Sequence, residues 1–510
     1  MKNYCMYAII ALMLFACKTE KKEKEKKKIQ TFGITTIPMP NTLVSGQSFP
    51  TDSTTINTWV SESKIVNNLE TNTDIITHGW DIWNALTEET DEKNNGQPLR
   101  RFETWYTPQD IQKSLRAKTS NTGLRLSSLE RFDTGNLEIP HQNQHGLKVK
   151  SSDVVGFVKC DPTSAQHIYN NELYFFEVLK SMIEPGKIAN IPAFPASSVL
   201  IKPVFYPLTK TDSLSPNTYS LPAWPGYHDQ VPMDSIIKNG FGSNYWNNDI
   251  TITTTGETDK EKKVFSINDF IHFKLSKTQA ANIINVIDNG QAKEGDYAVL
   301  VGMHVNTREN RRWTWQTFWW SENPNSPQSP SSSTIAELKP TTLDRASKHY
   351  SMALAYNMIS PAQPYYEGSN SITEEEPKKE SIYAYNPYLE AGFNADTFDV
   401  SASSQNPNNS GGNDSIRKYY SEGYQKVGAI RLSEKLYEGG KLNRVGIETN
   451  CMSCHGQARL YDVKSIKDSY QYYITDQYFD LNAPYFKSSV VLDFAWSIQG
   501  SLIYRDSISK

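Results

Sequence analysis

Three apolar runs in the middle of the chain have the residue pattern of β-strands. They are VLIKPVFYP at 199–207, AVLVGMHVN at 298–306 and RWTWQTFWW at 312–320. β-Branched and aromatic residues dominate these runs, and apolar and polar side chains alternate along the third. Side chains of this kind pack well on a pleated, partly buried surface. The sequence therefore predicts a strand at each position.

Helical spacing of apolar residues is clearest between 164 and 182, where one helix is expected. The apolar residues that repeat there are Ile168, Leu173, Phe176, Leu179 and Met182. Further predicted elements are a short helix at 76–86, a strand at 101–106, a strand or turn at 267–273, and helices at 276–286 and 416–437.

Two stretches rich in Pro, Ser, Asn and Gly, at 321–333 and 405–414, are predicted loops. Predicted helices and strands are mixed along the chain, so the expected class is α+β. We expect a large, mixed, β-rich body at 31–400, followed by a mostly helical C-terminal region at 401–510.

Composition supports this class and excludes some partners. The 510 residues carry a formal net charge of −4, and nothing marks a nucleic-acid binder. Aromatic residues make up 12% of the chain, with 28 Tyr and 11 Trp, which fits a secreted, loop-rich protein better than a helical bundle.

The most informative motif is Cys-Met-Ser-Cys-His, which places Cys451, Cys454 and His455 in a Cys-x-x-Cys-His pentad. Two thiols at this spacing can add across the two vinyl groups of a haem, and the adjacent histidine then lies beneath the iron as its proximal ligand. The pentad predicts one covalently bound haem c. Alternatives are a redox Cys-x-x-Cys pair or half of a zinc site, but residues 456–510 contain no further Cys or His.

The first seventeen residues resemble a lipoprotein signal peptide. A short basic start is followed by an apolar run at 7–15, too short to span a bilayer, and then by Leu14-Phe15-Ala16-Cys17. This ending resembles a lipobox, and Cys17 would become the lipidated first residue of the mature chain. The alternative is an ordinary cleaved signal peptide. Residues 18–30 are mostly charged and would form a solvated tether.

The two ends of the chain predict the same location. Haem attachment of this type takes place outside the bacterial cytoplasm, as lipidation does, so we expect an exported lipoprotein of the cell envelope. Lys18 lacks the acidic character that often retains lipoproteins at the inner membrane, which favours the outer membrane, facing the periplasm or the cell surface. The lipid would be the membrane anchor.

The cysteine count leaves no pair for an intramolecular disulfide. Cys5 would leave with the signal peptide, Cys17 would carry lipid, and Cys451 and Cys454 would carry haem. Only Cys160 remains, and we expect it to be a buried small apolar residue.

Several segments resemble a family of bacterial single-haem proteins known as cytochrome c family proteins. The matching pieces lie at 78–105 (HGWDIW to RRFETW), 198–208, 297–320 and 449–458 (TNCMSCHGQA). After the Thr-Phe pair this chain has Trp319-Trp320, where many members carry an acidic residue and a histidine. The resemblance implies haem binding and electron transfer, with redox proteins as partners, and it specifies no substrate.

A sixth iron ligand would have to come from upstream of the pentad, because no Met or His follows His455. Candidates are His304, Met303, His349, Met352 and Met358, with an open or water-bound iron as the alternative. Met303 and His304 would point to opposite faces of a strand, so only one of them can face a haem.

The tryptophans at 313, 315, 319 and 320 have two interpretations. They could line a haem edge or a carbohydrate-binding platform, but such a stripe is more often one face of a packed sheet, which we favour.

These observations lead to three hypotheses about function. The first is a lipid-anchored electron carrier that exchanges single electrons with redox proteins. The second is a haem enzyme with an open iron, which reduces peroxide or a nitrogen oxide or oxidises a small substrate. The third is a binding module whose haem is structural or sensory. We favour the first, although the roughly 400 residues before the pentad exceed what holding one haem requires.

Overall fold

The computed structural model describes residues 35–94, 96–117, 154–227, 240–286, 291–356, 382–392, 447, 451–456, 458–461 and 486–505. All of them belong to one compact unit that begins at Thr35. The expected signal peptide with Cys17, the charged tether, the 405–414 loop and the 416–437 helix lie outside the described residues. Helices and several separate sheets are mixed along the described chain, which confirms the α+β class.

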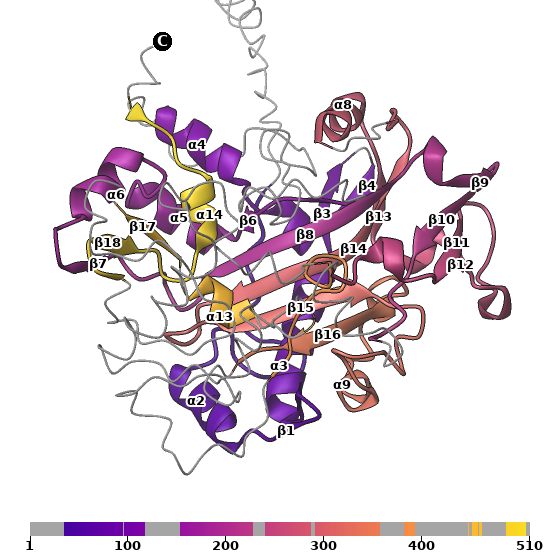
Figure 1. Cartoon of the computed structure of the whole chain (residues 1–510), viewed down its shortest axis with the longest axis horizontal. Helices are drawn as coiled ribbons and strands as arrows, with labels where there is room; N and C mark the ends of the chain where they lie inside the picture. Colours follow the sequence, from indigo (N-terminus) through magenta and orange to yellow (C-terminus); the bar gives the residue numbers. More distant parts are fainter. Residues whose placement is uncertain are drawn as a thin grey trace, which may run out of the picture. The chain divides into compact units, whose positions relative to one another are not determined.

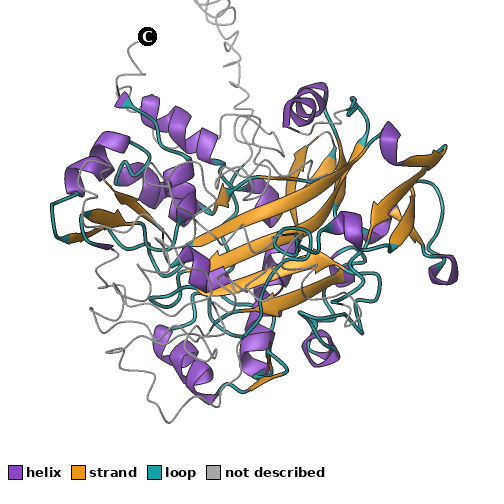
Figure 2. Cartoon of the chain, viewed as in Figure 1, coloured by secondary structure: helices purple, strands orange, loops and turns teal. Residues whose placement is uncertain are grey.

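A twisted central sheet forms the middle of this unit (Figure 2). Its neighbouring strands follow the order β16-β15-β14-β8-β5, while β13 also pairs with β14 and β6 with β8. All of these pairings are antiparallel. The strands are β5 (Val155–Gly156), β6 (Lys159–Cys160), β8 (Val199–Leu208), β13 (His272–Lys274), β14 (Tyr297–Thr307), β15 (Thr314–Trp320) and β16 (Tyr350–Leu354).

The three strands predicted from apolar runs are confirmed as β8, β14 and β15, within two residues at each end. The turn at Ile267–Asp269, strand β13 and helix α8 (Lys277–Val286) also follow the expected order. The predicted helix at 76–86 is the core of α3 (Thr73–Thr87).

Two local predictions were wrong. The expected strand at 101–106 begins instead with a 3₁₀ turn, Arg101–Thr104, in which Glu103 accepts a hydrogen bond from the backbone of Arg100. The expected helix at 164–182 is two helices, α5 (Pro162–Asn170) and α6 (Phe176–Met182). The helix breaks because Glu172 adopts a left-handed conformation, with φ of 54°.

Both faces of the central sheet are covered, so the strands contribute side chains to two separate cores. Along β15, Gln316, Phe318 and Trp320 face one core, and Trp315, Thr317 and Trp319 face the other. The tryptophans of the stripe are therefore packed in a sheet, as we favoured, but on both of its faces. Trp313 precedes the strand, with φ of 62°, and is fully buried.

Helix α3 supplies the main cover of the first face. Asn72 caps it by accepting hydrogen bonds from the N–H groups of Asp74 and Ile75. Trp83 stacks on Phe318 at 4.4 Å between ring centroids. At Gly79 a Cβ atom would lie 2.7 Å from Leu354 Cδ2, so glycine allows the helix to approach β16 this closely.

The second face is covered by elements from the two halves of the chain. Strands β17 (Arg459–Tyr461) and β18 (Ser489–Val491) are antiparallel, and β18 pairs in parallel with β7 (Ile188–Asn190). The C-terminal part of the chain is thus hydrogen-bonded to a segment about 300 residues earlier. Helix α14 (Trp496–Gly500) lies beside this small sheet, and α13 (Cys451–His455) lies near the ends of β14 and β15 (Figure 1).

Smaller elements complete the described fold. They are helices α2 (Ser53–Glu62), α4 (Pro108–Arg116) and α9 (Ser333–Glu337), a sheet of β9 (Ser213–Ser215), β10 (Thr218–Pro222), β11 (Asp249–Thr253) and β12 (Val264–Ser266), and the pairs β1 (Ile65–Val66) with β2 (Leu69–Glu70) and β3 (Glu89–Asn94) with β4 (Gln97–Arg100). Among the described helices, none is both long and apolar enough to cross a membrane.

Asn386 fastens the segment 382–392 to the second face of the sheet. Its side-chain amide donates to Thr317 Oγ1 at 2.9 Å and to the Phe318 carbonyl at 2.8 Å, and its oxygen accepts from the Tyr388 N–H at 3.1 Å. The amide lies directly over Gly302, where a Cβ atom would be 2.7 Å from Asn386 Nδ2. A side chain at position 302 would displace this buried amide.

Replacing Gly302 by Ala should therefore lower the free energy of unfolding by about 1–3 kcal/mol, because the new methyl group pushes the buried amide off its partners. Urea denaturation measures the change. Gly156→Ala is the matched control, since its Cβ would meet only ordinary contacts of 3.4 Å or more on the same sheet. Equal stability of the two variants would contradict this description of Asn386.

Candidate functional site

The pentad forms the short helix α13, which lies against the second face of the central sheet. The helix places positions 451, 454 and 455 on one side, because residues three and four apart are neighbours on a helix surface. Cys451 is a half-buried thiol, and its Sγ donates to the Ala384 carbonyl at 3.3 Å. Met452 is buried in the core on this face of the sheet.

The His455 ring is held in one tautomer by a backbone hydrogen bond. Its Nδ1 lies 3.0 Å from the carbonyl oxygen of Phe494. A carbonyl only accepts, so Nδ1 must carry the proton and donate it, which leaves the lone pair on Nε2. A hydrogen bond of this kind from the remote nitrogen is what orients and tunes a metal-ligating histidine.

The surroundings of His455 keep the imidazole neutral. The pKa of His455 is lowered to about 3, chiefly by burial; the hydrogen bond to Phe494 opposes this shift, and the neighbouring His304 and Lys202 add to it. At neutral pH the Nε2 lone pair is therefore available to a metal, since no proton competes for it. The ring also packs against Trp315, with 4.6 Å between ring centroids.

The carbonyl that binds His455 is positioned by an unusual turn. Residues Asp493 and Phe494 both have positive φ, 47° and 69°, although neither is glycine. Asp493 is fixed there by its Oδ2, which accepts from Arg308 Nε at 2.9 Å and from the Phe194 N–H at 3.0 Å. A strained backbone next to a candidate ligand indicates that this geometry is maintained by its surroundings.

One strand pairing and a backbone hydrogen bond bring this turn to the pentad. The chain leaves α13 through Ala458 and enters β17, which pairs with β18 from Arg459↔Val491 onward. The Leu492 N–H then donates to the Ala458 carbonyl at 2.9 Å, so residues 492–494 follow alongside the pentad. The sequence shows the pentad but not this partner, because the two segments meet only through sheet formation.

His304 lies on the same face of the sheet as His455. Its cross-strand neighbours are Lys202 of β8 and Thr317 of β15. The next pair on the same face of the sheet is Asn306 and Trp315. The Nε2 atom of His304 lies 2.7 Å from Glu390 Oε1, and its buried Nδ1 has no hydrogen-bond partner among the described residues. The structure thus brings the predicted distal candidate and the proximal candidate to one core.

The other candidates for a sixth ligand lie elsewhere. Met303 and Met352 are fully buried in the core on the α3 side, so the sheet separates them from His455. His349 stacks on Trp320, also on that side, with 6.0 Å between ring centroids. Met358 lies outside the described residues. Cys160 is buried, as predicted, and burial raises the pKa of its thiol.

The described residues of α13 fit a haem c. A thiol at position 451 and a neutral His455 with a free Nε2 meet the needs of thioether attachment and axial ligation. In the described parts of the chain, no three His, Cys, Asp or Glu side chains come together as a metal-binding group.

No family model, curated protein or solved structure matches this chain.

The turn that positions the Phe494 carbonyl can be tested through Asp493. Asp493→Ala should lower the free energy of unfolding by about 2–3 kcal/mol, because it removes two hydrogen bonds and places alanine at a positive φ. Asp493→Asn retains an acceptor oxygen and tolerates this backbone conformation, so its loss should be clearly smaller. If both variants unfold at the same urea concentration, Asp493 does not hold this turn.

Proposed function

We propose that this protein is a lipid-anchored c-type cytochrome with one covalent haem, which transfers electrons outside the bacterial cytoplasm. In this proposal Cys451 and Cys454 form the thioether bonds and His455 is the proximal ligand. The haem-bearing C-terminal region would be the mostly helical part of the chain expected at 401–510, joined to the β-rich body.

One observation carries the proposal. The residue that follows the Cys-x-x-Cys pair is a histidine with a protonated Nδ1, a free Nε2 lone pair and a strongly lowered pKa. A solvent-exposed histidine after a thioredoxin-type pair would need none of these features. The sequence motif and the local geometry thus support the same chemistry independently.

The roles of the protein's own residues follow from their positions. A bound haem would supply one-electron chemistry at its iron. His455 would hold the metal, and the Phe494 carbonyl would hold His455 in the required orientation through Nδ1. Trp315 would limit rotation of the imidazole, and the core around Trp319 and Phe494 would exclude water, which tunes the potential.

The proposed location is the bacterial cell envelope. Lipid on Cys17 would anchor the protein, facing the periplasm or the cell surface at the outer membrane, and the tether at 18–30 would allow it to reach redox protein partners. The cytochrome c family resemblance of the quoted segments supports this proposal, without naming a partner or substrate.

A second function is favoured by one contact. The Nε2 atom of His304 is already engaged by Glu390 at 2.7 Å. If this contact prevents His304 from binding the iron and no other residue takes its place, the iron would be open, and the protein would be a haem enzyme acting on a small molecule such as peroxide or a nitrogen oxide.

Haem attachment should depend on the pentad and not on the remaining thiol. When the chain is produced in a host with haem-ligation machinery, Cys451→Ser and Cys454→Ser should each reduce the haem that stays bound after denaturation, and the double variant should abolish it. Cys160→Ala should retain full haem content by pyridine haemochrome assay. Undiminished haem in the double variant would exclude the pentad as the attachment site.

The two functions differ in the ligand state of the iron. For the electron carrier, the reduced protein should be low-spin and unchanged by carbon monoxide, and His304→Ala should make it bind carbon monoxide. Met303→Leu is the control, because Met303 is the adjacent residue of the strand and faces the opposite side of the sheet. This variant should leave the response to carbon monoxide unchanged. Carbon monoxide binding by the unaltered protein would contradict the carrier and support the enzyme.

A further inference from the structure

A second candidate site lies on the opposite side of the central sheet, where β15 ends and β16 begins. An open cleft of about 620 Å³ is lined there by the side chains of Lys260, Lys339, Arg345 and Lys348, together with one carboxylate, Asp269. This volume is typical of small-molecule sites. The cationic side chains outnumber the carboxylate, so the lining is positively charged.

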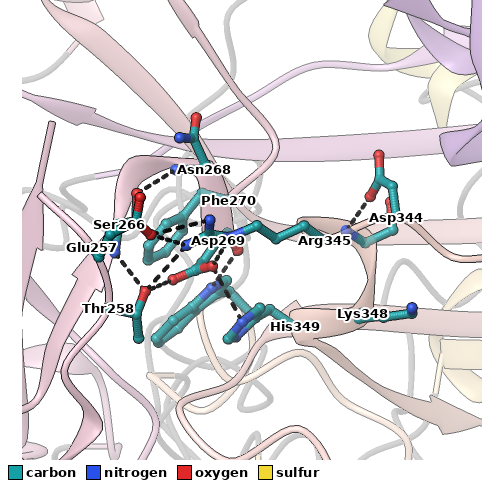
Figure 3. A network of polar contacts seen from close by, with 12 residues as sticks. Glu257, Thr258, Ser266, Asn268, Asp269, Phe270, Asp344, Arg345, Lys348 and His349 are labelled. Carbon is teal, nitrogen blue, oxygen red and sulfur yellow. Dashed lines mark hydrogen bonds and ion pairs between the residues drawn. The ribbon is translucent and has the colours of Figure 1, made fainter. Parts of the chain in front are cut away.

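The single carboxylate organises its neighbours. Asp269 Oδ1 accepts from Arg345 Nε at 2.6 Å and lies 3.6 Å from His349 Nε2. Thr258 donates its hydroxyl to the other oxygen of the same carboxylate. Figure 3 shows Arg345 and His349 reaching Asp269 from the same side of the network. Burial would raise the pKa of Asp269, but the hydrogen bonds from Arg345 and Thr258 outweigh it and lower the pKa.

Arg345 retains donors for another acceptor. Its Nη atoms lie 3.4 Å from Glu257 Oε2, which is a long contact, and Glu257 is 85% exposed at the rim. A guanidinium carries five N–H donors, and only Nε forms a short hydrogen bond here. An incoming anion can therefore bind Arg345 without breaking its bond to Asp269.

Lys339 is the partly buried cation of the cleft. Its Nζ donates to the carbonyls of Pro324 at 2.6 Å and Lys348 at 3.2 Å, and it lies 5.1 Å from the centroid of the Trp80 ring. An ammonium group has three donors, so one remains for a ligand. Burial lowers the pKa of Lys339 to about 7, and an adjacent anion would favour its charged form.

We propose that this cleft binds a small organic anion that carries two or more carboxylate or phosphate groups. Arg345 and Lys339 would contact one anionic group directly, while Lys260 and Lys348, both exposed, would attract and neutralise the others. Pro324 and Pro340 supply apolar walls for a short carbon skeleton.

The cleft is distinct from the pentad. In the cleft, His349 stacks on Trp320, which faces the α3-side core. Trp315, at the other end of β15, faces the opposite side of the sheet and packs on His455 there. The cleft and the pentad therefore lie on opposite faces of the central sheet.

Isothermal titration calorimetry of the full-length protein, with citrate and with inorganic pyrophosphate as probes, tests the proposal. Both titrations are run at constant ionic strength set with sodium chloride. The double variant Lys260→Gln/Lys348→Gln removes two exposed charges from the lining and should weaken binding of the preferred probe at least tenfold. The control Lys210→Gln/Lys277→Gln removes two exposed charges elsewhere and should leave Kd unchanged.

The relative affinities identify the class of ligand, since tighter citrate binding indicates carboxylates and tighter pyrophosphate binding indicates phosphates. Arg345→Gln provides a second variant and should also weaken binding. No heat of binding from either probe, or equal weakening in the cleft and control variants, would overturn the proposal, because binding would then be absent or a property of net charge alone.

Discussion

Strand β14 is hydrogen-bonded along both edges, by β8 and β15, and covered on both faces, and this constraint fixes where the candidate chemistry lies. Successive side chains of a strand point to opposite faces, so each residue of β14 belongs to one of two cores. Met303 is thereby committed to the α3 side and His304 to the pentad side. A shift of one residue in register would exchange these two side chains between the two faces. The close contact between Gly302 and Asn386 matters because it requires the observed register.

The pentad depends on the body of the protein for its geometry. The small sheet of β7, β18 and β17 joins residues near 190 to residues near 460 and 490. Through that sheet, the turn at Asp493 and Phe494 presents a carbonyl to His455, and Arg308, which follows β14, holds the turn in place. A C-terminal fragment with the pentad alone would lack both the sheet partner β7 and Trp315.

The sequence predicted the long strands, α3, the α+β class and a buried Cys160, because these follow from local periodicity and composition. It missed the division of 164–182 into two helices, since apolar spacing continues across Glu172 while the backbone turns there. It also missed Asn386, the Asp493–Phe494 turn and the cationic cleft. These depend on contacts between segments far apart in the chain, and a single sequence carries no signal for such contacts. For the candidate site, the three pentad residues come from the motif, and the residues that orient them come only from the fold.

The most direct test of the central claim is acid–acetone extraction of the mature protein after production in a host with haem-ligation machinery. We expect haem absorbance to stay with the precipitated polypeptide, since thioether bonds survive this treatment while His455 ligation does not. Absorbance that passes entirely into the solvent, or a protein without haem, would contradict covalent attachment at Cys451 and Cys454.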